Sequence, residues 1–348
     1  MAENSASPLR VAVVGAGAFG RNHLRVYREL ELAGLPVQLV AVVDRDAKTL
    51  AAATAQYSIP GFATIEECLA AMPLNAASIC APTVAHAECA RVLLPAGVDL
   101  LIEKPVATTL AEADEIIRLA HEYGRIVQVG HLERFNPAVR AVRGLMNHPM
   151  FFEVHRLSVF TPRSLDVDVV LDVMIHDLDL VMSLVDSTVR EVRAVGLPVL
   201  SRKVDIANVR LEFENGCVAN FTASRVSTER VRKMRFFQPH QYLSLDFARQ
   251  DLLLIDVTAA AGLDPAQLAA LASAAAASGQ PAPGLSLSKI AVEPGEPLRM
   301  EIQSFVEAVR GRTQPEVPAE AGRAALALAL EINAAIASHA QRTGLSSR

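Results

Sequence analysis

The chain has 348 residues, of which 51% are hydrophobic and 20% are charged, and its formal net charge is -5. This length exceeds the roughly 250 to 300 residues at which one hydrophobic core usually divides, so we expect two domains. The composition excludes the disordered and fibrous classes. The acidic balance argues against nucleic acid or an anionic membrane surface as a partner.

Four cysteines occur without a CxxC pair: Cys68, Cys80, Cys89 and Cys217. This spacing predicts buried free thiols, and neither a disulfide framework nor a zinc site. The first nine residues lack the basic start and apolar run of a signal peptide, and no apolar run of 18 residues is evident later. We therefore expect a cytoplasmic protein with no membrane segment.

Residues 9–130 alternate short apolar runs with longer helical patterns. The runs are Arg10–Val14, Val37–Val43, Ala76–Cys80, Val98–Ile102 and Ile126–Val129. This alternation predicts an α/β fold, with a doubly wound parallel sheet of the Rossmann type over residues 1–130. Thr64 with Glu67, and Thr109, match helix-start signals. We expect a C-terminal helix over 319–341 to pack back on this domain.

Residues 131–318 predict a second, α+β domain with a large, mostly antiparallel, open-faced sheet. One helix over Val169–Val185 is followed by strand-type runs at Val189–Leu200, Val204–Glu214, Cys217–Arg225, Met234–Phe237 and Tyr242–Phe247. Consecutive strands without intervening helices pair antiparallel. Asn215-Gly216 predicts a type I′ hairpin turn. The Ala-rich segment 258–284 is expected to be a surface helix with a linker, and the open sheet face is expected to form a homodimer or homotetramer.

The sequence Gly15-Ala16-Gly17-Ala18-Phe19-Gly20 follows a predicted strand and precedes a helix. In such a loop the glycines permit a tight turn, approach of the backbone to a pyrophosphate and close helix packing. The second strand ends at Asp44, where a carboxylate binds ribose hydroxyls and repels a 2′-phosphate. The pattern predicts NAD, while Arg45 can stack on adenine or accept that phosphate, so NADP stays open as the lesser alternative.

Lys104 follows an apolar run and precedes Pro105, at the carboxyl end of a predicted parallel strand, where such sheets bind ligands. A partly desolvated lysine suits work as an acid, a base or a stabiliser of an alkoxide. Further on, Asp172 and His176 are four residues apart in a helical pattern, so the carboxylate can orient the imidazole. A purely structural pair, or a metal site completed by Asp179, are the alternatives; without a second histidine cluster we expect no metal.

Four stretches resemble the Gfo/Idh/MocA oxidoreductases, the family of glucose-fructose oxidoreductase and inositol dehydrogenase. They are the loop 15–20, Cys80-Ala81-Pro82-Thr83 with His86, Glu103-Lys104-Pro105, and the pair Asp172 and His176. The resemblance implies that Lys104 and His176 flank a substrate hydroxyl, supported by Asp172. It implies cofactor contacts from Gly15, Gly17, Ala18, Phe19, Gly20, Asp44, Arg45, Ala81, Thr83, His86, Glu103 and Lys104.

Within that family, residues 130–137 and 235–239 resemble the UDP-N-acetylglucosamine 3-dehydrogenases, which prepare amino-sugar precursors of lipid A. This implies substrate contacts from Glu133, Arg134, Phe135, Asn136, Arg163 and Arg225. A basic run, which suits a diphosphate, comprises Arg225, Arg230, Arg232, Lys233 and Arg235. The expected function is NAD-dependent oxidation of a sugar hydroxyl, foremost the 3-hydroxyl of UDP-N-acetylglucosamine. The alternatives are a dehydrogenase of myo-inositol or another simple sugar and a non-catalytic NAD-binding redox sensor, and the proton acceptor is either Lys104 or His176.

Overall fold

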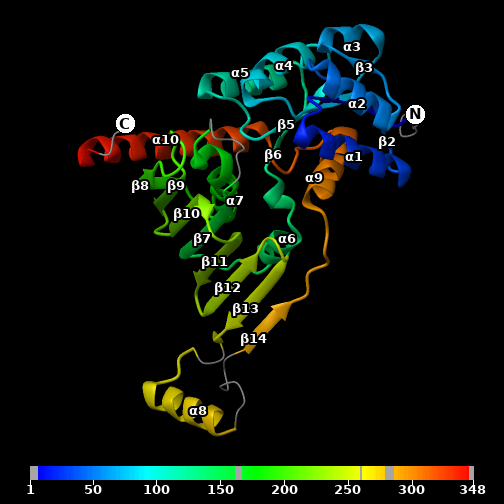
Figure 1. Ribbon diagram of the computed structural model, residues 1–348. Coiled ribbons are helices and arrows are strands. Elements are labelled where there is room, and N and C mark those ends of the chain that lie inside the picture. The colour runs from blue at the N-terminus through cyan, green and yellow to red at the C-terminus, as the bar shows by residue number, and fades with distance from the viewer. Residues whose placement is uncertain (1–6, 161–166, 259–260, 279–285, 345–348) are drawn as a thin grey trace. The chain divides into compact units, whose positions relative to one another are not determined.

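A computed structural model describes residues 7–160, 167–258, 261–278 and 286–344 (Figure 1). Contacts along the chain divide it into two compact units. Unit 1 comprises residues 1–135 and 295–327, and unit 2 comprises residues 136–294 and 328–348. Each unit contains one sheet, and we describe the two separately.

Unit 1 contains a six-stranded parallel sheet with the strand order β3-β2-β1-β4-β5-β6. Its strands are β1 (Leu9–Val14), β2 (Val37–Val43), β3 (Gly61–Phe62), β4 (Ala76–Ile79), β5 (Asp99–Glu103) and β6 (Val127–Gly130). Five of them match the predicted runs to within one or two residues, so the Rossmann-type prediction is confirmed. The strand order reverses between β1 and β4, and ligands of such sheets bind at the carboxyl ends of the strands near that reversal.

The helices of unit 1 are α1 (Ala18–Leu32), α2 (Ala47–Tyr57), α3 (Ile65–Ala71), α4 (His86–Leu93), α5 (Leu110–Glu122) and α9 (Pro297–Gly311). Thr109 and Glu112 form a full capping box at α5. At α3 the predicted box is incomplete, because Glu67 accepts from the backbone of Ala63 and not from that of Thr64. The sequence analysis missed α9, whose buried Ile302 and Phe305 belong to the same core as α1, β1 and β2.

Unit 2 contains an eight-stranded sheet with the order β14-β13-β12-β11-β7-β10-β9-β8. Its strands are β7 (Phe151–Val159), β8 (Val189–Leu197), β9 (Ile206–Phe213), β10 (Val218–Ser227), β11 (Val231–Gln238), β12 (Gln241–Asp246), β13 (Asp251–Asp256) and β14 (Ser286–Ile290). The prediction of a mostly antiparallel sheet is confirmed. The sequence analysis missed β7, which lies inside the sheet and pairs parallel with β10. Polar residues, among them Glu153, His155 and Arg156, interrupt the apolar ones along β7, which weakened the strand signal in the sequence.

The β9–β10 hairpin forms where it was predicted, but its turn is not of type I′. That turn needs positive φ at both central residues. Gly216 has φ 83°, whereas Asn215 is not among the positive-φ residues of the described chain. Gly216 N–H donates to the carbonyl of Phe213, and Asn215 Oδ1 accepts from Cys217 N–H. The loop is therefore a type I turn closed by a left-handed glycine.

The predicted helix over Val169–Val185 has two parts in the structure. A π-helical turn, Val170–Met174, precedes α7 (Ile175–Leu184), and Ile175 N–H donates to the carbonyl of Val170 five residues earlier. Single π-helical turns inside α-helices are frequent at functional sites. Unit 2 also contains α6 (Pro137–Arg143) and α8 (Pro265–Ser278), and α8 agrees with the helix predicted in the Ala-rich segment.

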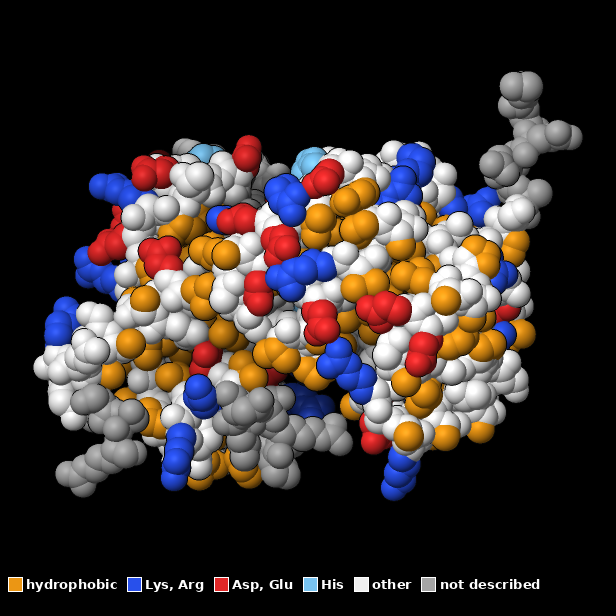
Figure 2. Space-filling view, turned by 90° about the horizontal axis from the view of Figure 1, so that it is seen from above, with side chains coloured by type: hydrophobic (Ala, Val, Ile, Leu, Met, Phe, Trp, Pro, Cys, Tyr) orange, Lys and Arg blue, Asp and Glu red, His pale blue; other side chains and the backbone are white. Residues whose placement is uncertain are grey.

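Helix α10 (Ala319–Thr343) begins in unit 1 and ends in unit 2. Among the described helices it is the one long and apolar enough to cross a membrane, judged by length and composition alone. The sequence analysis expected no apolar run of 18 residues, so it did not identify α10 as a segment of this length and composition. Leu326, Ala329 and Ile332 are buried, as in a helix that packs against a protein core. Figure 2 shows acidic and basic side chains interspersed on one face of the protein, with no large patch of a single sign.

Candidate active site

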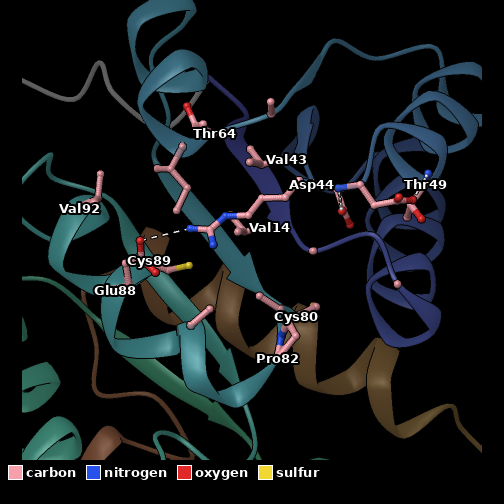
Figure 3. A pocket seen from close by; sticks show the side chains of 18 of the residues that line it. Val14, Val43, Asp44, Thr49, Thr64, Cys80, Pro82, Glu88, Cys89 and Val92 are labelled. Atoms are coloured by element: carbon pink, nitrogen blue, oxygen red, sulfur yellow. Dashed lines mark hydrogen bonds and ion pairs between the residues drawn. The ribbon is translucent and has the colours of Figure 1, made fainter.

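A pocket of about 720 Å³ lies in unit 1 at the carboxyl ends of β1, β2 and β4 (Figure 3). It contains Gly15 and Gly17 of the glycine loop, Asp44 and Arg45 after β2, and the segment 80–82 after β4. This edge is where the strand order reverses. The structure thus brings together residues that the sequence analysis assigned to the cofactor from three separate segments.

The glycine loop has the geometry of a phosphate cradle. A Cβ atom on Gly15, where φ is +90°, would lie 2.6 Å from the backbone nitrogen of Ala81. A Cβ on Gly20 would lie 1.8 Å from the carbonyl oxygen of Gly15. A Cβ on Gly17 would meet nothing within 4 Å, so the space beside it is open. No side chain caps the N-terminus of α1 at Gly17, which leaves the N–H groups of the first turn to an anion.

Asp44 stands at the end of β2 with its carboxylate turned toward the loop. Oδ2 accepts from the N–H of Ala16 at 2.7 Å, and Oδ1 accepts from the N–H of Asp46 at 2.8 Å. The carboxylate is therefore held in place by backbone donors. These contacts and the open space beside Gly17 fit a dinucleotide with its pyrophosphate at α1 and its adenosine ribose at Asp44.

The end of the pocket beside Asp44 is acidic. Arg45 forms an ion pair with Glu88 of α4 at 3.2 Å, and both side chains are exposed (Figure 3). Asp44, Asp46, Glu66 and Glu88 line the pocket together with this one arginine. The sequence analysis missed Glu66 and Glu88, since no motif marks them; the position of Glu88 two residues after His86 is the one hint in the sequence.

The segment after β4 forms the floor of the pocket. Burial raises the pKa of the Cys80 thiol well above its ordinary value, so this cysteine stays an uncharged wall. Thr83 begins a short 3₁₀ turn, Thr83–Ala85, that leads into α4. The ring of His86 is buried between two carbonyl oxygens, those of Ala81 and Pro105. Burial lowers the pKa of His86, although the hydrogen bonds to these two carbonyls oppose that shift.

Lys104 directly follows β5, as predicted, and its side chain is half-buried. Glu103, the last residue of β5, is 8% exposed, and its carboxylate lies 2.9 Å from Nε2 of the buried His23. The sequence analysis assigned no role to His23. No recurring spacing links it to Glu103, which lies 80 residues away in the chain.

In unit 2, Asp172 lies in the π-helical turn and His176 in the first turn of α7. Their neighbour Asp179 is fully buried. Asp177 is buried too, and its two oxygens accept from the guanidinium of Arg156 of β7, each at 2.7 Å. This ion pair attaches α7, the helix that carries His176, to the sheet of unit 2.

The residues predicted to contact substrate are distributed over several elements. Glu133 and Phe135 are buried in a 3₁₀ turn, Leu132–Phe135, that also contains Arg134. Asn136 caps α6 through its Oδ1 atom and donates from Nδ2 to the carbonyl of Phe247. Arg163 lies outside the described residues.

The side chain of Arg225 is buried, and other residues of unit 2 hold its guanidinium. Its guanidinium donates to Asp205 Oδ1 at 2.9 Å and to the carbonyls of Val167 and Val204. Lys233 and Arg235 are two apart on β11 and share a face, while Arg232 points to the opposite face. The basic run therefore does not form one cationic surface. Its presence in the sequence is thus no longer an argument that a diphosphate binds to β11.

Comparison with known proteins agrees with this geometry. Residues 9–131 match the model of the Gfo/Idh/MocA oxidoreductase family with an NAD-binding Rossmann fold, and residues 138–238 match the C-terminal domain of the same family. The UDP-N-acetylglucosamine 3-dehydrogenase of Acidithiobacillus ferrooxidans is 34% identical over 335 residues, which cover 96% of this chain and 99% of that protein. A solved structure of that enzyme superposes with a TM-score of 0.83 over 95% of this chain and 98% of its own.

A second relative is the inositol 2-dehydrogenase of Acidothermus cellulolyticus, 30% identical over 199 residues, 54% of this chain and 56% of that protein. The fold and the dinucleotide pocket define the chain as an oxidoreductase with an NAD-binding Rossmann fold. It belongs to the Gfo/Idh/MocA family.

Proposed function

We propose that this enzyme oxidises a sugar hydroxyl with NAD as the hydride acceptor, and that its substrate is UDP-N-acetylglucosamine, oxidised at the 3-hydroxyl. The observation that carries the proposal is the 34% identity with a UDP-N-acetylglucosamine 3-dehydrogenase along nearly the full length of both chains. The inositol 2-dehydrogenase match covers about half of this chain, so a cyclitol or simple sugar is the second candidate.

Asp44 supports NAD over NADP as the cofactor. A 2′-phosphate on the adenosine ribose would approach a carboxylate that two backbone N–H groups already hold in place. Arg45, the one arginine that lines the pocket, is paired with Glu88. The carboxylates of Asp44 and Glu88 therefore both oppose the binding of a phosphate dianion.

We assign roles to three residues on the family resemblance. His176 accepts the proton of the substrate hydroxyl, Asp172 orients its imidazole, and Lys104 stabilises the negative charge that develops on oxygen. The roles of Lys104 and His176 as acid and base can be exchanged. Bound NAD supplies the hydride acceptor. Of the residues predicted to contact substrate, we retain Glu133, Arg134, Phe135 and Arg163, while Asn136 and Arg225 act by shaping unit 2.

The test is NADH formation with UDP-N-acetylglucosamine, UDP-glucose, N-acetylglucosamine and myo-inositol as substrates. We expect turnover with the first, and Lys104→Ala to lower it by roughly 10²- to 10⁴-fold with NAD affinity nearly intact. Turnover with myo-inositol alone would transfer the assignment to the second candidate. Full activity of Lys104→Ala would remove Lys104 from the chemistry.

We further propose a cytoplasmic homodimer or homotetramer that associates through the open face of the unit 2 sheet. Three aromatic rings form a row on this face: Phe151, Phe237 and Tyr242, with centroid separations of 5.7 and 5.0 Å. Phe237 is 39% exposed, which is unusual for a phenylalanine in a sheet. Light scattering on the parent and on Phe237→Asp tests this; a monomeric parent would reject the proposal.

A further inference from the structure

Two buried histidines of unit 1 contact the residues on either side of Lys104. His23 is 0% and His86 is 1% exposed. His23 contacts the side chain of Glu103, which precedes Lys104, and His86 contacts the carbonyl of Pro105, which follows it. We propose that His23 and His86 are positioning residues that fix the backbone from which Lys104 projects. The proposal rests on the reactive role of Lys104 proposed above.

On the first side, Glu103 is confined between α1 and β6. Its carboxylate lies 2.9 Å from His23 Nε2 in α1. At Gly130, the last residue of β6, an added Cβ would lie only 2.9 to 3.0 Å from three atoms of that carboxyl group. The absence of a side chain at Gly130 therefore makes the space that the carboxylate fills. A carboxylate oxygen accepts, so His23 Nε2 is the donor in this contact.

The confinement of Glu103 has a consequence for its neighbour. Successive side chains along a strand point to opposite faces, and Glu103 is the last residue of β5. With its carboxylate held on one face, the backbone leaves β5 in a defined direction, and Lys104 begins on the other face. A lysine has four rotatable side-chain bonds, so the fold can fix the backbone from which the side chain projects better than it can fix the ammonium group itself.

On the second side, His86 joins two loops. Its Nδ1 lies 3.0 Å from the carbonyl oxygen of Pro105, and its Nε2 lies 2.9 Å from that of Ala81. Ala81 belongs to the floor of the dinucleotide pocket, and His23 lies three residues beyond Gly20 of the glycine loop. Both histidines thus connect the backbone around Lys104 to segments that hold the cofactor.

The expected size of the effect follows from geometry. A misplacement of about 1 Å at a reacting group can lower turnover by about 10²-fold. Loss of one of two anchors should permit a smaller shift, so we expect a loss in kcat of about ten- to a hundred-fold. Affinity for NAD should change little in a His23 variant, because His23 does not line the pocket.

The experiment compares His23→Met with His23→Gln in the full-length enzyme. Methionine fills the space without a donor, whereas the amide nitrogen of glutamine can occupy the place of Nε2 and donate to Glu103. We expect His23→Met to lower kcat ten- to a hundred-fold with KM and the NAD Kd within about three-fold of the parent, and His23→Gln to recover most of kcat. His121→Gln, at an exposed histidine paired with Glu320 in the same unit, is the control and should match the parent.

Two further measurements keep the proposal testable if His23→Met does not fold or the substrate assignment is wrong. Gly130→Ala presses on Glu103 from the opposite side with His23 intact, and should also lower kcat. The NMR signal of ¹³C-methylated Lys104, assigned by its loss in Lys104→Arg, should move in Gly130→Ala without any substrate. An unchanged signal, an unchanged kcat in a folded variant, or failure of His23→Gln to restore kcat would overturn the proposal. A moved signal in an enzyme that turns over no tested sugar would support it and reject the proposed substrate.

Discussion

Exchanging Gly17 and Gly20 for alanine should separate the two tasks of the glycine loop. At Gly20 the new Cβ would collide with the carbonyl oxygen of Gly15 at 1.8 Å, a clash within the protein itself. Overpacking of this kind costs about 1 to 3 kcal/mol, and each kcal/mol lowers the Tm of a domain of this size by about 2 to 4 °C. At Gly17 the Cβ would meet nothing within 4 Å, so the free protein should keep its stability.

Binding of NAD should respond differently in the two variants. A methyl group at Gly17 would occupy the space where the pyrophosphate approaches the backbone, and the loss of one hydrogen bond to a charged group costs about 1.5 to 3 kcal/mol. That corresponds to a rise in Kd of roughly 10- to 150-fold. Calorimetric unfolding and NAD titration of both variants measure the two effects. If Gly17→Ala bound NAD as tightly as the parent, or Gly20→Ala were as stable, the geometry assigned to this loop would be refuted.

Three other predictions concern charge. Asp44→Asn should raise the ratio of kcat/KM for NADP to that for NAD by about ten-fold or more, because two unit charges about 4 Å apart near a protein surface repel by about 1 to 4 kcal/mol; an unchanged ratio would reject Asp44 as a selector. Burial raises the pKa of Asp205, but hydrogen bonds from Ser201, Leu200 and Val199 outweigh it and lower the pKa far below its ordinary value. The stabilisation by ionised Asp205 is therefore complete above the ordinary pKa of an aspartate and is lost as the pH falls toward the pKa of Asp205 in the folded protein. Asp205→Ala leaves Arg225 buried without this partner. We expect it to lower the free energy of unfolding by about 3 to 5 kcal/mol at neutral pH and by less in acid. Burial raises the pKa of three thiols, those of Cys68, Cys89 and Cys217, to about 11. Iodoacetamide should therefore label these thiols slowly in the folded protein at neutral pH and quickly in denaturant. Fast labelling of the native enzyme would contradict their burial.

The local pattern of residues was enough to predict the dinucleotide half. Strands β1 and β2 are buried on both faces from Val11 and from Leu39 onward and give continuous apolar runs there, and the glycines at 15, 17 and 20 have chemical tasks that no other residue performs. Asp44 could be assigned because its place depends on a short, regular connection from β1 through α1 to β2. Such information is local, and it survives in a single sequence.

The tertiary structure decided what depends on residues far apart in the chain. Strand β7 lies inside its sheet although its own sequence reads weakly, because its neighbours β10 and β11 supply the pairing. Arg225 belongs to a basic run in the sequence, but in the structure it is buried and its guanidinium donates to Asp205. In the same way, only the tertiary structure brings His23 of α1 to Glu103 of β5, since a contact across 80 residues leaves no periodic trace in the sequence.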